Sequence, residues 1–153
     1  MSSTMRNISA YIKSVFADAI PDIVAAGAGD ATESDGIWID RDGFESCELV
    51  MSYETVLALA ETLSFAGNIQ DADDSGGTNV GDFGTAFTAT VVETGDGSPT
   101  STKRGTFIRA FNLHGARRWL RSQITPDLSA SGTDTAEVMV LFILGGAIEV
   151  PVP

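Results

Sequence analysis

The amino-acid sequence predicts an all-β protein whose main body is a single β-sandwich. From Gly36 onward, short runs rich in Val, Ile, Phe, Thr and Leu alternate with clusters of Gly, Asp, Ser and Asn, which is the pattern of an all-β domain. The chain has 153 residues, of which 43 % are hydrophobic, a size and composition that suit one compact domain. No internal repeat and no long low-complexity tract divides it. We therefore expect an N-terminal segment and linker over residues 1–35 and a single β-sandwich over residues 36–153.

The N-terminal segment carries the one helix-like pattern in the sequence. Its apolar residues recur at spacings of three and four until Pro21 ends the pattern, which predicts a helix within residues 5–20. These apolar positions are Ile8, Tyr11, Ile12, Val15, Phe16 and Ile20. An extended arm is the alternative for this segment. The small, Gly-rich stretch "AAGAGDATESDG" that follows is typical of a loop or linker.

Seven strands are expected in the sandwich, each bounded by turn-forming residues. Their predicted ranges are 37–40, 46–54, 62–70, 87–93, 106–112, 117–125 and 137–144. The last of these strands is apolar on both faces for most of its length, which places it in the middle of a sheet. Only one of its faces can meet the second sheet of a sandwich, so the other face must be covered by the N-terminal segment, a loop or a neighbouring subunit. The tail "AIEVPVP" contains two prolines, which predicts an edge strand or an extended arm.

The charge of the chain limits its partners. A net charge of −12 argues against nucleic-acid binding, which depends mainly on Lys and Arg. Residues 1–102 hold three basic and seventeen acidic side chains, whereas residues 103–153 hold six basic and four acidic ones. This asymmetry indicates a cationic strip in the late segment that faces something acidic, either another chain or the protein's own front half. A solvated face is the other alternative.

No segment is typical of a membrane span or of a secretory signal. The apolar run over residues 138–144 is far shorter than the ~20 residues needed to cross a bilayer. The N-terminus lacks an unbroken apolar stretch and a small-residue cleavage site, so we expect no export. The single cysteine, Cys47, has no internal disulfide partner and no metal-ligand spacing around it, so we expect a small core or surface thiol.

The sequence contains no group of residues that is typical of a catalytic site. A hydrolytic triad needs a base beside a nucleophile, and the single histidine, His114, lies in "FNLHGARRW" at an expected turn between two strands. No Gly-rich stretch has the Lys and the spacing of a phosphate-binding loop. We therefore expect neither an enzyme nor a cofactor.

The acidic stretch "DADDSGGTNVGD" over residues 71–82 has the spacing of a calcium loop. Asp71, Asp73, Ser75 and Asp82 occupy the first, third, fifth and twelfth positions, and hard cations favour clustered oxygen ligands. The flanking segments are strand-like rather than helical, however, and the terminal bidentate Glu of such loops is replaced by the shorter Asp82. An Asp- and Gly-rich connection between two strands is therefore the favoured interpretation, with a cation site as the alternative.

The cluster "RRWLR" is the strongest candidate for a binding surface. In a strand, Arg117, Trp119 and Arg121 lie on one face, because side chains alternate. Guanidinium groups beside an indole favour cation–π contacts, and Trp and Arg are enriched at interface hot spots. The alternative is an exposed strand whose arginines pair with the acidic front half of the chain.

Several stretches together resemble small head proteins of tailed phages. They are "MRNISAYI" at 5–12, "IDRDGFESCELV" at 39–50, the acidic loop "DADDSG", and "GARRWLRSQITPDLSASGTDTAEVMVLFILGG" at 115–146. The best understood proteins of this kind are cement, or decoration, proteins of jelly-roll type encoded near the major capsid protein. The chain departs from the usual pattern in the insertion "ETGDGSPTSTKRG" and in its ending "AIEVPVP".

The resemblance implies a jelly-roll β-sandwich that binds and stabilises the outside of a phage capsid after synthesis in the host cytoplasm. The implied partners are the major capsid protein and further copies of the chain, in a trimer, with neither nucleic acid nor membrane involved. A carbohydrate- or surface-binding β-sandwich module that uses calcium is the alternative function. The residues expected at interfaces are Tyr11, Phe16, Arg117, Trp119, Arg121, Ile148, Val150 and Val152.

Overall fold

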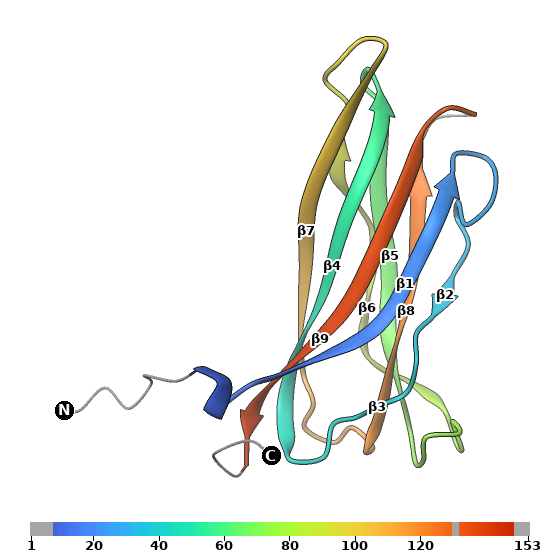
Figure 1. Ribbon diagram of the computed structural model, residues 1–153. Helices are drawn as coiled ribbons and strands as arrows, with labels where there is room; N and C mark the ends of the chain where they lie inside the picture. The colour runs from blue at the N-terminus through green and yellow to red at the C-terminus, as the bar shows by residue number, and fades with distance from the viewer. Residues whose placement is uncertain (1–7, 130–131, 149–153) are drawn as a thin grey trace.

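Two antiparallel sheets packed face to face form the protein, as the computed structural model shows for residues 8–129 and 132–148 (Figure 1). Sheet A has the order β1-β9-β4-β7, with bounds β1 (Lys13–Val24), β9 (Thr135–Ala147), β4 (Phe44–Ala58) and β7 (Thr100–Asn112). Sheet B has the order β2-β8-β5-β6, and β3 also pairs with β8. Its strands are β2 (Ser34–Asp35), β8 (Trp119–Leu128), β5 (Thr62–Ala72), β6 (Gly81–Thr94) and β3 (Ile39–Asp40). The prediction of an all-β sandwich is confirmed.

The N-terminal segment is a strand, so the prediction of a helix within residues 5–20 is wrong. A single 3-10 turn, Ile8–Ala10, precedes β1, and β1 pairs with β9 at the edge of sheet A. Register shifts interrupt this pairing between Phe16 and Asp18 and between Ile20 and Ile23. Such bulges insert extra residues into a strand. Val15 packs against the core, whereas the next residue, Phe16, is 46 % exposed on the outer face, so the apolar positions that predicted one helix face are divided between two faces of a strand.

The strand predicted to be central is central. β9 lies between β1 and β4, and its alternate residues Val138, Val140, Phe142 and Leu144 are buried against sheet B. The other six predicted strands all overlap strands of the structure. Most observed strands are longer than predicted. The added parts of β6 and β7 are exposed or half-exposed and carry little apolar signal, whereas β4 is extended by the buried residues Phe44 and Leu57.

The core between the sheets is formed by buried apolar side chains from both sheets. The largest of these are Phe65, Phe142, Ile23, Leu49, Met51, Leu57, Leu63, Ile69, Leu113, Leu120, Ile124 and Leu144. Full burial of a side chain of this size contributes about 1.5–3 kcal/mol relative to exposure. The core therefore suffices to hold the two sheets together. Cys47 is part of it, and burial raises the pKa of its thiol to about 12.

Tyr53 of β4 connects sheet A to the edge strand of sheet B. Its hydroxyl oxygen lies 3.0 Å from the carbonyl oxygen of Val92 and 3.2 Å from Oε2 of Glu93, both on β6. The Tyr53 ring crosses Gly105 of β7, where an added Cβ would lie only 2.3 Å from the hydroxyl oxygen. Glycine at this position therefore makes room for the ring. Burial, followed by the neighbouring Glu93, raises the pKa of Tyr53 to about 12.

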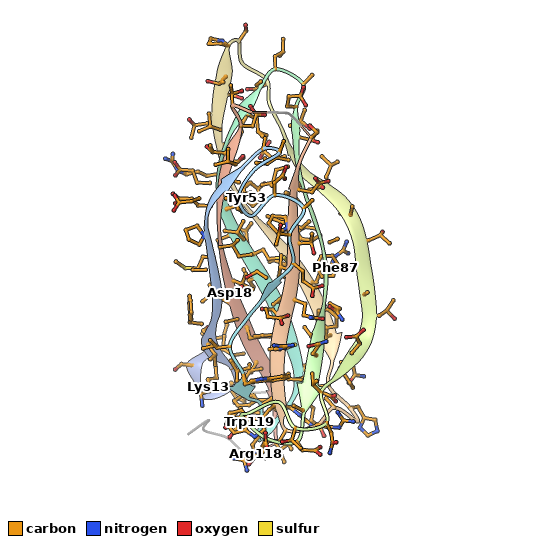
Figure 2. The ribbon with its side chains drawn as sticks, turned by 90° about the vertical axis from the view of Figure 1, so that its right-hand side faces the viewer. Lys13, Asp18, Tyr53, Phe87, Arg118 and Trp119 are labelled. Carbon is orange, nitrogen blue, oxygen red and sulfur yellow. The ribbon has the colours of Figure 1, made fainter. Side chains whose placement is uncertain are left out.

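An inward-pointing arginine closes the side of the sandwich between β6 and β7. The guanidinium carbon of Arg109 lies 5.3 Å from the centroid of the Phe87 ring and 4.7 Å from that of Phe107, and Figure 2 labels Phe87 on β6. Its Nη2 donates to the hydroxyl of Thr90 at 3.2 Å. A charged side chain that points inward from an edge strand is a known defence against edge-to-edge association.

Candidate functional site

The predicted cationic strip lies at one end of the sandwich, where Figure 2 labels Arg118 and Trp119. Trp119 and Arg121 belong to β8, whereas Arg117 precedes that strand and turns toward the β5–β6 loop. The structure therefore does not align Arg117 with the other two along one strand. The sequence pattern did not indicate Trp38 as a neighbour of this cluster. In the structure, the guanidinium carbon of Arg121 lies 4.9 Å from the centroid of the Trp38 ring.

The three arginines of the cluster, Arg117, Arg118 and Arg121, are each paired with acidic side chains of the same chain. Arg121 contacts Asp35 at 3.0 Å and donates from Nε and Nη2 to the side-chain oxygen of Gln70. Arg118 contacts Asp40 at 2.6 Å, and Arg117 contacts two carboxylates of the acidic stretch. This is the pairing with the acidic front half that was the alternative to an interface. A role of these residues in contacts with another protein stays a prediction.

Arg118 also sets the protonation of its partner. Its guanidinium donates to both carboxylate oxygens of Asp40, at 3.0 and 2.6 Å, which lowers the pKa of that carboxyl. The same hydrogen bonds raise the pKa of Arg118. The pair therefore stays charged over the whole physiological range, and it holds β3 against the start of β8.

The acidic stretch forms the connection between β5 and β6, which confirms the favoured interpretation of a strand connection. Asp71 is the last but one residue of β5, and its carboxylate accepts from the backbone N–H of Arg117 at 2.9 Å and from Nη1 at 3.2 Å. Asp73 lies 3.3 Å from Nε of the same arginine. Asp82, in β6, accepts instead from Nε2 of Gln70 at 2.9 Å.

The three carboxylates proposed as calcium ligands, those of Asp71, Asp73 and Asp82, are thus engaged by donors of the chain. Inside the turn, Asp74 accepts from the hydroxyl and N–H of Thr78 and from the N–H of Gly76. These hydrogen bonds lower the pKa of Asp74, the side-chain bond from Thr78 most of all. The exposed Ser75 lies at the tip of the same turn. Within the described ranges, 8–129 and 132–148, no three His, Cys, Asp or Glu side chains are grouped so as to hold a metal ion.

The outer face of sheet A is the second candidate surface. We use this name for the side chains of its four strands that point away from sheet B. At the centre of the face, residue pairing across the strands brings four apolar side chains into one row. This central row consists of Phe16 of β1, Leu141 of β9, Val50 of β4 and Ile108 of β7.

Further apolar side chains flank the central row. Met139 and Ala19 pair on one side of it, and Ile143 and Ala110 lie on the other. Figure 1 looks onto this sheet, and no described strand lies in front of it. The exposed fractions are 46 % for Phe16, 48 % for Ile108 and 50 % for Met139. Because isolated apolar residues are common on surfaces but contiguous rows are not, this face is a candidate interface.

Two shallow hollows lie at the ends of this face. One, of about 380 Å³, is lined by Ala19, Pro21, Met139 and the charged residues Glu54, Glu137 and Arg104, among others. The other, of about 460 Å³, is lined by Ile8 and Ile12 of the N-terminal segment together with residues of β4, β7 and β9. The N-terminal segment therefore lies against one end of the face, and Phe16 and Ile108 of the central row stay about half-exposed.

The remaining predicted interface residues lie near that end of the molecule or beyond the described ranges. Tyr11 is half-buried directly after the 3-10 turn, and Ile148 is 66 % exposed after β9. Val150 and Val152 lie outside the described residues. Among all the predicted interface residues, only Phe16 belongs to the central row.

Side chains with catalytic potential do not gather at either surface. His114 is exposed in the turn between β7 and β8, where the sequence placed it. Cys47 is in the core, where the raised pKa keeps the thiol protonated. No helix in the described part of the chain is long and apolar enough to cross a membrane.

No protein-family model matches the chain, and no curated protein sequence matches it. Two solved structures of infectious bursal disease virus are similar to it, one of the Gx strain with a TM-score of 0.42 and one of the Gt strain with a TM-score of 0.43. Sequence identity is 10 % in both cases. The matches cover 92 % and 93 % of this chain but 34 % of each viral chain, so the chain spans about a third of the length of these structures.

Proposed function

We propose that this chain is a structural protein of a virion that binds the outside of a phage capsid as a cement, or decoration, protein. One observation carries the proposal: the outer face of sheet A presents an apolar row from Phe16 to Ile108, and the two ends of this row are about half-exposed, whereas Val50 in its middle is buried. The motifs that resemble small phage head proteins indicate which kind of partner to expect. The major capsid protein is the partner that we propose, together with further copies of the chain in a trimer.

The physical logic of cementing suits a rigid sandwich with one apolar face. Burial of apolar surface drives association without the need for catalytic groups. Many copies placed across capsomer junctions multiply modest contacts by avidity. The protein is therefore proposed to act mechanically and without enzymatic activity.

We propose that the contact lies on sheet A rather than on the arginine cluster. Arg117 and Arg121 are engaged by carboxylates of the chain, so their exchange for partner contacts would leave those carboxylates unpaired. Phe16, in contrast, is half-exposed and already aligned with Leu141 and Ile108. We therefore propose that Phe16 contacts the shell and that the paired arginines keep one end of the sandwich rigid.

The test is to mix the purified chain with phage heads that lack it. We expect saturable, stoichiometric occupancy and a higher temperature of head disruption, because bound copies bridge neighbouring capsomers. Absence of saturable binding, or heads that disrupt at the same temperature with and without the chain, would refute the cement function.

A further inference from the structure

One row of the outer face of sheet A is charged rather than apolar. Glu137 of β9 pairs directly across from Glu54 of β4, which pairs in turn with Arg104 of β7. Nε of Arg104 donates to Oε2 of Glu54 at 2.6 Å. Among the described residues, no lysine or arginine lies within ion-pair distance of Glu137. The row thus holds two carboxylates and one cation, and that cation is engaged by Glu54.

This arrangement is unfavourable in the isolated chain. Residues directly opposite each other in an antiparallel pair have Cβ atoms about 4.5–5.5 Å apart, and like charges in that position destabilise a sheet. β1 does not offset the repulsion between Glu137 and Glu54, because its pairing with β9 is interrupted beside Glu137, between Ile20 and Ile23. A second cation placed next to Glu137 would remove the repulsion.

The surroundings of Glu137 are shaped to receive a side chain. The hollow of about 380 Å³ is lined by Glu137, Glu54 and Arg104 together with the apolar side chains of Ala19, Pro21 and Met139. Met139 lies one row away from Leu141 of the central row on the same face of β9, so the hollow adjoins that row. A long side chain with an apolar stem and a cationic head fits both parts, because such side chains bury the stem and expose the charge.

Charge also argues against a second copy of the chain on this face. Glu48, Glu54 and Glu137 point outward from it, against the single cation Arg104, and the whole chain has a net charge of −12. Two-fold pairing brings the same patch of both copies together. If the two-fold axis runs along β4, Glu48 and Glu54 of one copy face the same residues of the other copy. If the two-fold axis runs between β4 and β9, Glu137 of one copy faces Glu54 of the other.

We propose that the outer face of sheet A docks on an apolar surface of the capsid subunit that carries a lysine or arginine, and that this cation enters the hollow and pairs with Glu137. The inference rests on the proposed cement function and specifies its partner. The apolar row supplies contact area, and Glu137 selects the orientation, because charges at the rim of an interface mainly fix register and association rate.

The test compares Glu137→Gln with wild type in binding to phage heads that lack the chain. The substitution keeps the size of the side chain and removes the repulsion with Glu54, so we expect a melting temperature equal to or above that of wild type. Binding should weaken about threefold to tenfold at low salt, and this difference should shrink as sodium chloride is raised. Asp127→Asn is the matched control, because Asp127 is exposed on β8 of the other sheet and should bind like wild type.

The possible outcomes separate the inference from the function on which it rests. If wild type binds the heads and Glu137→Gln binds equally well, the inference is wrong while the cement function stands. If wild type does not bind, both are wrong. If sedimentation shows that Glu137→Gln makes the free chain associate through sheet A and leaves head binding unchanged, a second copy occupies the face and the proposed cationic partner is refuted.

Discussion

The apolar central row can be tested by making the outer face of sheet A polar without disturbing the core. In the double variant Ile108→Thr/Met139→Thr, both substituted side chains lie on this face and are 48 % and 50 % exposed. Full burial of such a side chain is worth about 1.5–3 kcal/mol, so docking that covers the exposed half should gain about 1 kcal/mol from each. The double variant should therefore lose about 2 kcal/mol of binding free energy, or roughly thirtyfold in affinity.

The assay is quantitative co-sedimentation of the variant with phage heads that lack the chain. Threonine suits a strand, so the variant should fold and unfold within about 1 kcal/mol of wild type in urea. The control is Leu59→Thr/Val91→Thr, which removes two apolar side chains of similar exposure, 58 % each, from other parts of the surface. Equal affinities of the two double variants would refute the assignment of the outer face of sheet A as the docking surface.

Three further predictions concern the fold and the acidic stretch. Tyr53→Phe should cost about 1 kcal/mol of unfolding free energy near pH 8, because hydrogen bonds to β6 are lost. The pKa of Tyr53 is raised to about 12, so the greater unfolding free energy of wild type should persist below about pH 10 and vanish as the pH rises toward 12. Urea unfolding of both proteins at several pH values measures this, and a difference in unfolding free energy that stays constant with pH would contradict it. Asp71→Asn should cost about 1–3 kcal/mol in urea unfolding, because the nearly buried Asp71 carboxylate loses its charge-assisted hydrogen bonds from the partly exposed Arg117. The exposed control Asp82→Asn should cost little, and equal costs would contradict this. Calcium should leave the melting temperature unchanged, because internal donors engage the β5–β6 loop, and a clear rise would restore the cation site.

The strands of the sandwich could be predicted because their alternation is regular. β9 shows how far this goes, since its apolar residues on both faces correctly indicated a central strand, while the predicted cover of its outer face stays a prediction. β1 shows where the approach fails. The apolar spacing that ends at Pro21 predicted one face of a helix, but in the strand Val15 and Ile20 face the core while Phe16 faces outward, and the bulge after Phe16 has no sequence signature.

The candidate surfaces were harder to predict, because they depend on pairing between distant strands. The sequence singled out Arg117 and Arg121 by their clustering, but it could not show that Asp71 and Asp35 engage them. Conversely, the central row draws one residue from each of four strands and leaves no local signature. The opposition of Glu137 and Glu54 arises in the same way, from the register of β9 against β4.

The proposed cement function requires that another protein covers the outer face of sheet A. The rate of oxidation of Met139 measures this directly. Its side chain is 50 % exposed in the free chain, whereas Met51 is fully buried and serves as an internal reference. Hydrogen peroxide converts accessible methionine to the sulfoxide, which mass spectrometry quantifies for each residue. The account predicts that Met139 is oxidised rapidly in the free chain and slowly in the chain bound to phage heads. Equal rates of Met139 oxidation in the free and bound chain would contradict it.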